Sequence, residues 1–245
     1  MKLYIDIGNT AIKWATDGEL EKGLLHQTHS ADLPTAIEEV WLELVKPDAV
    51  YIASVRRRQV DRKLLQWVER EWQIEALFAE TRRQEHGVTN GYEQPGQLGV
   101  DRWLALIAAR ALSPSPQIVV DCGSATTIDA MDNEGRHIGG IILPGKRLLA
   151  EALRQNTDIP PHDGGVIRDY FATDTASGIQ TGAVVVQCAT VEKLYHMLQQ
   201  RETGEVRCVV TGGDAGYLSA YLELPHEVVP GLVLRGLQLQ SGLDA

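Results

Sequence analysis

The pattern of apolar and polar positions in the first half of the chain predicts three short strands followed by alternating helices and strands. Residues 3–7, 11–15 and 24–28 are apolar, β-rich runs, and the turn signals Gly8-Asn9 and Asp17-Gly18 separate them. This spacing is typical of an antiparallel meander. The spacing of apolar residues then predicts helices over 37–45, 60–68 and 100–112, and strands over 49–55 and 75–78.

Residues 81–99 are expected to form an irregular loop, because Gly87, Asn90-Gly91, Pro95-Gly96 and Gly99 crowd this stretch. Loops of this length are uncommon in compact domains and are often functional. A second break, the segment 113–116 with sequence Ser-Pro-Ser-Pro, predicts a domain boundary. We therefore expect an N-terminal half over 1–115 and a C-terminal half over 116–245.

The second half repeats the order of the first half. Three β-rich runs are followed by alternating helices and strands, and a period of about half the chain indicates a duplication. The strands are expected over 117–121, 126–130, 137–143, 206–210 and 227–229. The helices are expected over 146–155, over 175–200 with an interruption near Gly182, near Tyr217, and from 232 to the end.

The two halves share a turn motif that could bind phosphate. Asp6-Ile7-Gly8-Asn9-Thr10 and Asp121-Cys122-Gly123-Ser124-Ala125-Thr126-Thr127 each place an Asp at the end of an apolar strand, before a glycine turn with hydroxyl or amide side chains. Successive backbone N–H groups in such a turn form an anion nest, and the Asp could hold Mg²⁺ together with phosphate oxygens. The alternative is a plain hairpin whose Asp bonds its own turn. The three hydroxyls of the second copy favour phosphate binding there.

Asp101 and Arg102 follow the glycine-rich loop at the expected start of a helix. Asp101 could be a first-turn acid that the helix dipole favours, with Arg102 as its surface ion partner. The alternative is a site residue beneath a loop that closes over a substrate, and Tyr92 in that loop would then contact the substrate. Lys13 lies in the strand after the first turn and could point to either face.

The net charge of −10 argues against nucleic acid as the main partner, because phosphate backbones are bound by concentrated Lys and Arg. Cys122, Cys188 and Cys208 show no paired spacing, which excludes a disulfide framework and favours a reducing compartment. The seven histidines lack metal-ligand spacing. The N-terminal residues do not resemble a secretory signal, and no apolar run is long enough to cross a membrane.

Taken together, these motifs resemble the type III pantothenate kinase family, which is part of the superfamily of acetate and sugar kinases, Hsp70 and actin. One position departs from the family pattern, since Ser124 stands where Thr is usual, and Ser keeps the hydroxyl. The matching segments follow in the expected order: Asp6-Ile7-Gly8-Asn9-Thr10, Gly99-Val100-Asp101-Arg102, Asp121-Cys122-Gly123-Ser124-Ala125-Thr126-Thr127, Gly139-Gly140-Ile141-Ile142-Leu143-Pro144-Gly145, Asp174-Thr175 and Thr211-Gly212-Gly213.

The resemblance implies an α/β fold with two duplicated ribonuclease-H-like halves, mixed sheets and a cleft between the halves. It implies that ATP phosphorylates pantothenate in the first step of coenzyme A synthesis, in a cytoplasmic homodimer. Asp101 would be the catalytic base, Asp6 would lie near Mg²⁺, and Asp121 would bind K⁺ or NH₄⁺. ATP would contact Asp6, Ile7, Gly8, Asn9, Thr10, Ala11, Ile12, Lys13 and Ser124. Pantothenate would contact Tyr92, Gly99, Val100, Asp101, Arg102 and Thr175.

Two other functions are compatible with parts of the pattern. The chain could be a regulatory module with a vestigial nucleotide site, but Asp6, Asp101 and Asp121 are all present, and a degenerate relative would have lost at least one. It could also be a superfamily kinase or phosphatase that acts on a sugar, acetate or polyphosphate. The segment 87–102 is where those enzymes would differ, and here it matches the pantothenate pattern.

Overall fold

The computed structural model describes residues 1–29, 41–54, 59–159 and 165–242, and the chain divides into two compact units. Unit 1 comprises residues 1–114, 135–137 and 230–245, and unit 2 comprises residues 115–134 and 138–229. Of the helix expected over 37–45, residues 37–40 lie outside the described residues, and among 41–45 only Trp41 is helical, so in this part the helix ends earlier than expected.

Unit 1 contains a five-stranded mixed sheet with the strand order β3-β2-β1-β4-β5. The central strand β1 pairs antiparallel with β2 and parallel with β4, so the chain enters the sheet as a meander and continues through crossover connections. The strands expected at 3–7, 11–15 and 49–55 are thereby confirmed. The bounds are β1 (Lys2–Ile7), β2 (Ala11–Thr16), β3 (His26–His29), β4 (Ala49–Ser54) and β5 (Leu77–Phe78).

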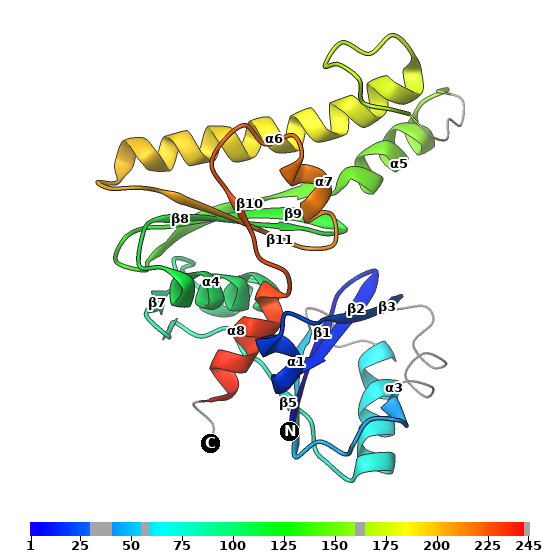
Figure 1. Cartoon of the computed structure of the whole chain (residues 1–245), viewed down its shortest axis with the longest axis vertical. Coiled ribbons are helices and arrows are strands. Elements are labelled where there is room, and N and C mark those ends of the chain that lie inside the picture. Colours follow the sequence, from blue (N-terminus) through cyan, green and yellow to red (C-terminus); the bar gives the residue numbers. More distant parts are fainter. Residues whose placement is uncertain (30–40, 55–58, 160–164, 243–245) are drawn as a thin grey trace. The chain divides into compact units, whose positions relative to one another are not determined.

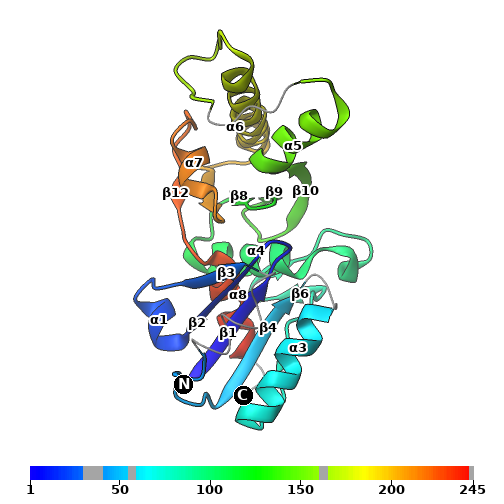
Figure 2. The same ribbon diagram turned by 90° about the vertical axis from the view of Figure 1, so that its right-hand side faces the viewer.

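Helices cover both faces of this sheet (Figure 2). On one face, α3 (Gln59–Trp67) and its π-helical continuation η1 (Val68–Trp72) bury Leu64 and Trp67 against Ile5 and Ile52. On the other face, α8 (Leu232–Ser241) places Ser241 Oγ 3.4 Å from the hydroxyl of Tyr4.

Helix α8 also packs against α4 (Val100–Leu112), the helix that begins with the candidate catalytic segment. A Cβ on Gly236 would lie only 2.0 Å from the carbonyl oxygen of Leu104, so the two helix backbones are in close contact. The C-terminal helix therefore belongs to unit 1, whereas the expected division at residue 115 assigned it to the second half. Its buried leucines, and not its position in the chain, decide where it packs.

Two local expectations in unit 1 were wrong. Asp17-Gly18 begins a short helix, α1 (Asp17–Glu21), because Thr16 and Glu19 form a capping box that satisfies the first backbone N–H groups. The segment 81–99 is not wholly irregular. It contains a hairpin of β6 (Gln84–Glu85) and β7 (Val88–Thr89) and a 3₁₀ turn, η2 (Pro95–Gln97).

Unit 2 repeats the sheet of unit 1, with the strand order β10-β9-β8-β11-β12. Its central strand β8 pairs antiparallel with β9 and parallel with β11, as β1 does with β2 and β4. The expected duplicated α/β fold with mixed sheets is therefore confirmed. The bounds are β8 (Gln117–Cys122), β9 (Ala125–Met131), β10 (His137–Pro144), β11 (Arg207–Thr211) and β12 (Glu227–Val228).

The 27-residue helix α6 (Thr175–Arg201) runs along the sheet of unit 2 (Figure 1). The expected interruption at Gly182 is absent, because Gly182 faces open space while Val184, Val191 and Leu198 bury one continuous stripe. Helices α5 (Lys146–Asn156) and α7 (Ala215–Ser219) complete the unit. None of the helices in the described part of the chain has an apolar stretch long enough to cross a bilayer.

Candidate active site

The first candidate phosphate turn connects β1 to β2 in unit 1. The backbone N–H of Gly8 donates to the carbonyl oxygen of Ala11 at 3.0 Å and closes the turn. Ile7 and Ile12 are buried on either side and anchor it. A Cβ on Gly8 would lie 3.0 Å from that same carbonyl oxygen, so the turn is as tight as the sequence predicts. Asn9 at the tip is exposed, and Thr10 is half-buried.

Asp6 and Lys13 are directly opposite each other on the two strands of this hairpin. Directly opposed residues of an antiparallel pair project from the same face. This pairing places both side chains on one face of the sheet, which is also the face of Tyr4 because side chains alternate along a strand. Both side chains are half-buried. The register thus decides the orientation of Lys13, which the sequence left open. The hairpin presents a carboxylate, an ammonium group and a glycine turn together.

The start of α4 holds the candidate base. Asp101 accepts a hydrogen bond at Oδ1 from the backbone N–H of Arg102 at 2.8 Å, within the first turn. Gly99 is the N-cap, and a Cβ there would lie 2.5 Å from the same carboxylate oxygen. The glycine therefore makes room for the carboxylate. The positive end of the helix dipole stabilises a negative charge at this position. Val100, the first residue of the helix, is half-buried.

Arg102 and Tyr92, two residues that the family resemblance assigns to the substrate site, are in contact. The guanidinium of Arg102 donates from Nη1 to the hydroxyl oxygen of Tyr92 at 3.0 Å, and Arg102 is only 6% exposed. The ring of Tyr92 stacks on His137, with 5.7 Å between ring centroids. No local pattern connects His137 with this loop, because 45 positions separate His137 from Tyr92 and only the folded chain brings them together.

The second candidate phosphate turn connects β8 to β9 in unit 2 and is one residue shorter than the first, because residues 123–125 join the paired Cys122 and Thr126, whereas residues 8–11 join the paired Ile7 and Ile12. The N–H of Gly123 donates to the carbonyl oxygen of Ala125 at 3.0 Å. Cys122 is buried, and burial raises the pKa of its thiol, which agrees with its expected role as a packed apolar residue. Asp121 is half-buried and lies opposite Thr127 on β9 and Thr211 on β11.

Two further glycine turns close around this one. The N–H of Gly145 donates to the carbonyl oxygen of Ser124 at 3.0 Å, and a Cβ on Gly145 would lie 2.3 Å from the carbonyl oxygen of Gly123. Gly212 has φ +98°, and a Cβ there would lie 2.5 Å from Oδ1 of Asp121. The three turns that the sequence singled out in this half therefore meet at one place, with Asp121 among them.

Lys146 and Asp214 extend this cluster, and the sequence analysis missed both. Lys146 Nζ lies 2.8 Å from Oδ1 of Asp214 and 4.1 Å from the ring centroid of Tyr217. Each residue directly follows a predicted motif, Pro144-Gly145 or Thr211-Gly212-Gly213, and that adjacency was the available signal. Lys146 places a cation at the start of α5, next to the turn that contains Ser124.

Thr175 is the first residue of α6 and is exposed. Its neighbour Asp174 is the N-cap, and it accepts from the N–H of Ser177 at 2.8 Å. Hydrogen bonds from the backbone and the side chain of Ser177 lower the pKa of the Asp174 carboxyl. Asp174 therefore has a structural reason to be present, while Thr175 stays an expected substrate contact. Among the described residues, no three His, Cys, Asp or Glu side chains gather as a metal site of their own.

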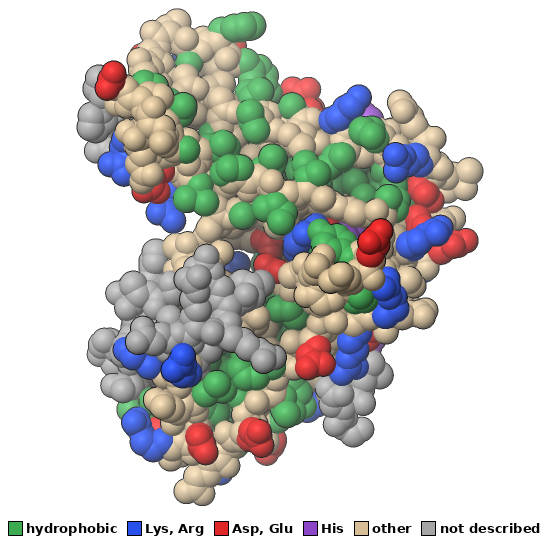
Figure 3. Space-filling view, turned by 180° about the vertical axis from the view of Figure 1, so that it is seen from behind, with side chains coloured by type: hydrophobic (Ala, Val, Ile, Leu, Met, Phe, Trp, Pro, Cys, Tyr) green, Lys and Arg blue, Asp and Glu red, His purple; other side chains and the backbone are tan. Residues whose placement is uncertain are grey.

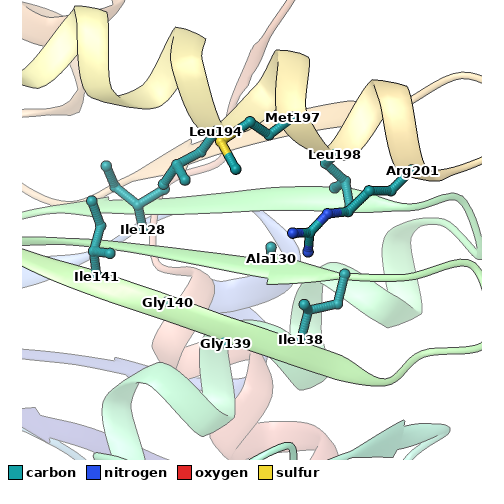
Figure 4. A pocket seen from close by; sticks show the side chains of 10 residues that line it. All are labelled: Ile128, Ala130, Ile138, Gly139, Gly140, Ile141, Leu194, Met197, Leu198 and Arg201. Carbon is teal, nitrogen blue, oxygen red and sulfur yellow. The ribbon is translucent and has the colours of Figure 1, made fainter.

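A separate groove of unit 2 lies between α6 and strands β9 and β10 (Figure 4). Its lining is apolar apart from one guanidinium and holds none of the residues expected to bind phosphate or substrate. The groove therefore does not have the chemistry of a nucleotide site. Its lining residues are Ile128, Ala130, Ile138, Gly139, Gly140, Ile141, Leu194, Met197, Leu198 and Arg201.

Comparisons with known proteins agree with the motifs. The family model of type III pantothenate kinase matches residues 2–197. A type III pantothenate kinase of Nitrosococcus oceani is 34% identical over 97% of this chain and 92% of its own length. That of Halorhodospira halophila is 37% identical over 97% and 96%. A candidate 2-dehydro-3-deoxygalactonokinase structure from Sinorhizobium meliloti covers 100% of this chain and 99% of its own, with a TM-score of 0.60 at 12% identity, which shows a shared fold.

Proposed function

This chain belongs to the type III pantothenate kinase family, and we propose that it transfers the γ-phosphoryl group of ATP to the terminal hydroxyl of pantothenate. The product is 4′-phosphopantothenate, and the reaction is the first step of coenzyme A synthesis. The observation that carries the proposal is the pair of glycine hairpins at equivalent places in two duplicated sheets, each preceded by an Asp on the central strand, in a chain that matches the family over almost its whole length.

Phosphoryl transfer depends mainly on alignment and charge neutralisation, and the two hairpins supply both. Backbone N–H groups of the turns at Gly8 and Gly123 would bind phosphate oxygens, with Lys13 and Ser124 beside them. Asp6 suits Mg²⁺, because its half-buried carboxylate projects from the strand that leads into the turn. Bound there, Mg²⁺ would neutralise charge on the phosphates.

Asp121 is proposed to hold the monovalent cation, K⁺ or NH₄⁺. The structural support is the close approach of Gly212, where any Cβ would collide with the Asp121 carboxylate and with the carbonyl oxygen of Cys122. Because Gly212 has no side chain, the carboxylate and carbonyl oxygens beside it can lie near one another, and hard cations prefer such oxygen ligands. A thiol or imidazole is not needed for this site.

Asp101 is proposed to accept the proton of the pantothenate hydroxyl as phosphoryl transfer proceeds. The helix dipole favours a negative charge at this N-terminal position, and a carboxylate can accept the proton when the hydroxyl lies within hydrogen-bonding distance. Arg102 and Tyr92, which contact each other, would bind the anionic substrate together with Gly99 and Val100. Thr175 would contribute a hydroxyl.

We also propose that the enzyme acts in the cytoplasm as a homodimer. Unit 2 exposes several large apolar side chains, and Figure 3 shows apolar side chains gathered on its surface. Ile142 is 61% exposed on β10, and Leu148 and Leu153 of α5 are also exposed. Such a surface is suited to burial against a second copy. Light scattering would give the mass of the particle, and Ile142→Lys should shift it toward the monomer.

The test of the activity is ADP release by the purified chain with Mg²⁺-ATP, with and without pantothenate, in K⁺ buffer and in Na⁺ buffer. We expect turnover that requires both pantothenate and K⁺. Release that does not need pantothenate would indicate a different acceptor. No release in either buffer would contradict the proposed activity and favour a regulatory module.

A further inference from the structure

Arg83 holds the backbone of the loop that carries Tyr92. Its guanidinium donates from Nη1 to the carbonyl oxygens of Asn90 at 3.2 Å and Tyr92 at 2.8 Å. From Nη2 it donates to the carbonyl oxygen of Glu93 at 2.6 Å. Three carbonyls within four residues thus converge on one planar donor group, and the forked geometry of arginine suits this arrangement.

The same loop is fastened from inside by Asn90, which is only 2% exposed. Its side-chain oxygen accepts from the N–H of Tyr92 at 2.9 Å, and its amide nitrogen donates to the carbonyl oxygens of Arg82 and Pro95, both at 3.3 Å. The N–H of Asn90 also donates to the carbonyl oxygen of Arg83. Asn90 therefore fixes where the loop begins, and Arg83 fixes how it continues through Tyr92.

A hydrogen bond connects this loop to the first turn of the candidate catalytic helix. The hydroxyl of Tyr92 accepts from Nη1 of Arg102, and Arg102 is the residue whose backbone N–H donates to the Asp101 carboxylate. A shift of the Tyr92 backbone would therefore move the partner of the Arg102 guanidinium. The side chain of Arg83 is exposed, so Arg83 is not part of the hydrophobic core. Its hydrogen bonds to the loop carbonyls are therefore better explained by a local role than by a contribution to the core.

We propose that Arg83 is a positioning residue for pantothenate, which acts by holding the 90–93 loop so that Tyr92 orients Arg102 toward the substrate. The proposal rests on the proposed function, because it takes Tyr92 and Arg102 as substrate contacts. In this role Arg83 would act through Tyr92 and would not itself contact the substrate or the reacting atoms. Its loss should weaken pantothenate binding and leave ATP binding and the chemical step nearly unchanged.

The variants Arg83→Gln and Arg83→Lys test this role, with Arg70→Gln as a matched control. Gln keeps hydrogen-bonding capacity but is too short for three carbonyls, whereas Lys keeps the reach and three donors. Arg70 is also an exposed arginine of unit 1, but it pairs with its neighbour Glu71. Arg83→Gln should raise the KM for pantothenate about tenfold. The KM for ATP, and both constants of Arg70→Gln, should stay within about twofold. Arg83→Lys should recover most of the loss.

A double-mutant cycle with Tyr92→Phe separates positioning from general weakening. If Arg83 acts through Tyr92, the KM of the double variant should be close to that of the worse single variant, because coupled residues are not additive. An unchanged pantothenate KM in Arg83→Gln would overturn the proposal. The proposal would also be overturned if the increases in pantothenate KM of the two single variants multiplied in the double variant.

Amide hydrogen exchange gives a readout that does not depend on turnover. In Arg83→Gln the amides of residues 92 and 93 should exchange faster, while those in the second and later turns of α4 should keep their wild-type rates. If the wild-type chain does not phosphorylate pantothenate, the proposed function fails. In that case faster exchange confined to the loop would still support the Arg83 clamp, and unchanged exchange would exclude it.

Discussion

Replacing Gly99 by alanine should displace the Asp101 carboxylate without unfolding the protein. The backbone of Gly99, with φ −55° and ψ 137°, is open to any L-residue, so alanine brings no backbone strain. Its Cβ would lie 2.5 Å from Oδ1 of Asp101 and 3.7 Å from the carboxyl carbon. A carbon and an oxygen cannot stay that close, so the carboxylate must move by roughly 0.5–1 Å.

The size of the effect follows from that displacement. A catalytic group that is misplaced by about 1 Å can lose about 100-fold in rate. We therefore expect kcat to fall about 10- to 100-fold, or about 1.4–2.7 kcal/mol in the barrier. Stability should fall far less, since the hydrogen bond from the Arg102 N–H to the carboxylate, which the shift weakens, is worth about 1 kcal/mol or less at this half-exposed site.

Single-turnover phosphoryl transfer, together with thermal unfolding, measures the two quantities separately. Gly96→Ala is the matched control, because Gly96 lies in the same loop and a Cβ there would meet no atom within 4 Å. It should leave kcat and the melting temperature unchanged. A wild-type kcat in Gly99→Ala would refute the reasoning, because it would show that the position of the Asp101 carboxylate does not matter for the reaction.

Three further outcomes are expected. Asp101→Asn should lower kcat by at least about 100-fold while ATP binding, followed by calorimetry, is unchanged; full activity would exclude Asp101 as the base. Gly236→Ala should destabilise unit 1 by about 1–3 kcal/mol in denaturant unfolding, because its Cβ would lie 2.0 Å from the Leu104 carbonyl oxygen, whereas Gly216→Ala, with open space around it, should not destabilise. The pKa of Asp174 is lowered in the fold, so its cap should be present above about pH 4 and be lost as the pH falls through the lower folded value. Amide exchange in the first turn of α6, once corrected for the intrinsic pH dependence, should show this loss of protection, and Asp174→Ala should abolish its pH dependence.

Much of the fold could be predicted because the two hairpins use strong local signals. Runs of apolar residues end at Asp6 and Asp121, and glycines two positions later allow the tight turns seen at Gly8 and Gly123. Local signals also explain one error. The capping box of Thr16 and Glu19 is a T-x-x-E pattern in the sequence, whereas the expected turn rested on the Asp17-Gly18 pair alone.

Other features depend on contacts between distant residues and gave no local signal. Helix α8 joins unit 1 because Gly236 allows close packing on α4 and because Gln240 bonds the backbone of Glu80 in both directions, at 3.1 and 3.0 Å. Neither partner is near in sequence. His137 under Tyr92 and the clamp of Arg83 are of the same kind. The residue types of the candidate site were therefore predictable, whereas the residues that support them were not.

The acidic composition does not argue against nucleotide binding, because each turn has its own cation. In unit 1, Lys13 is placed opposite Asp6 by the register of the hairpin itself. In unit 2, the equivalent strand carries Thr126 and Thr127, and Lys146 comes instead from the start of α5, where Asp214 holds it. The two halves thus share a backbone device for anions but draw their positive charge from different elements. Comparison of the two motifs points to neither lysine: Lys13 stood out by its place after the first turn, and Lys146 was not predicted, although in a chain with a net charge of −10 a nearby cation favours the binding of a polyphosphate.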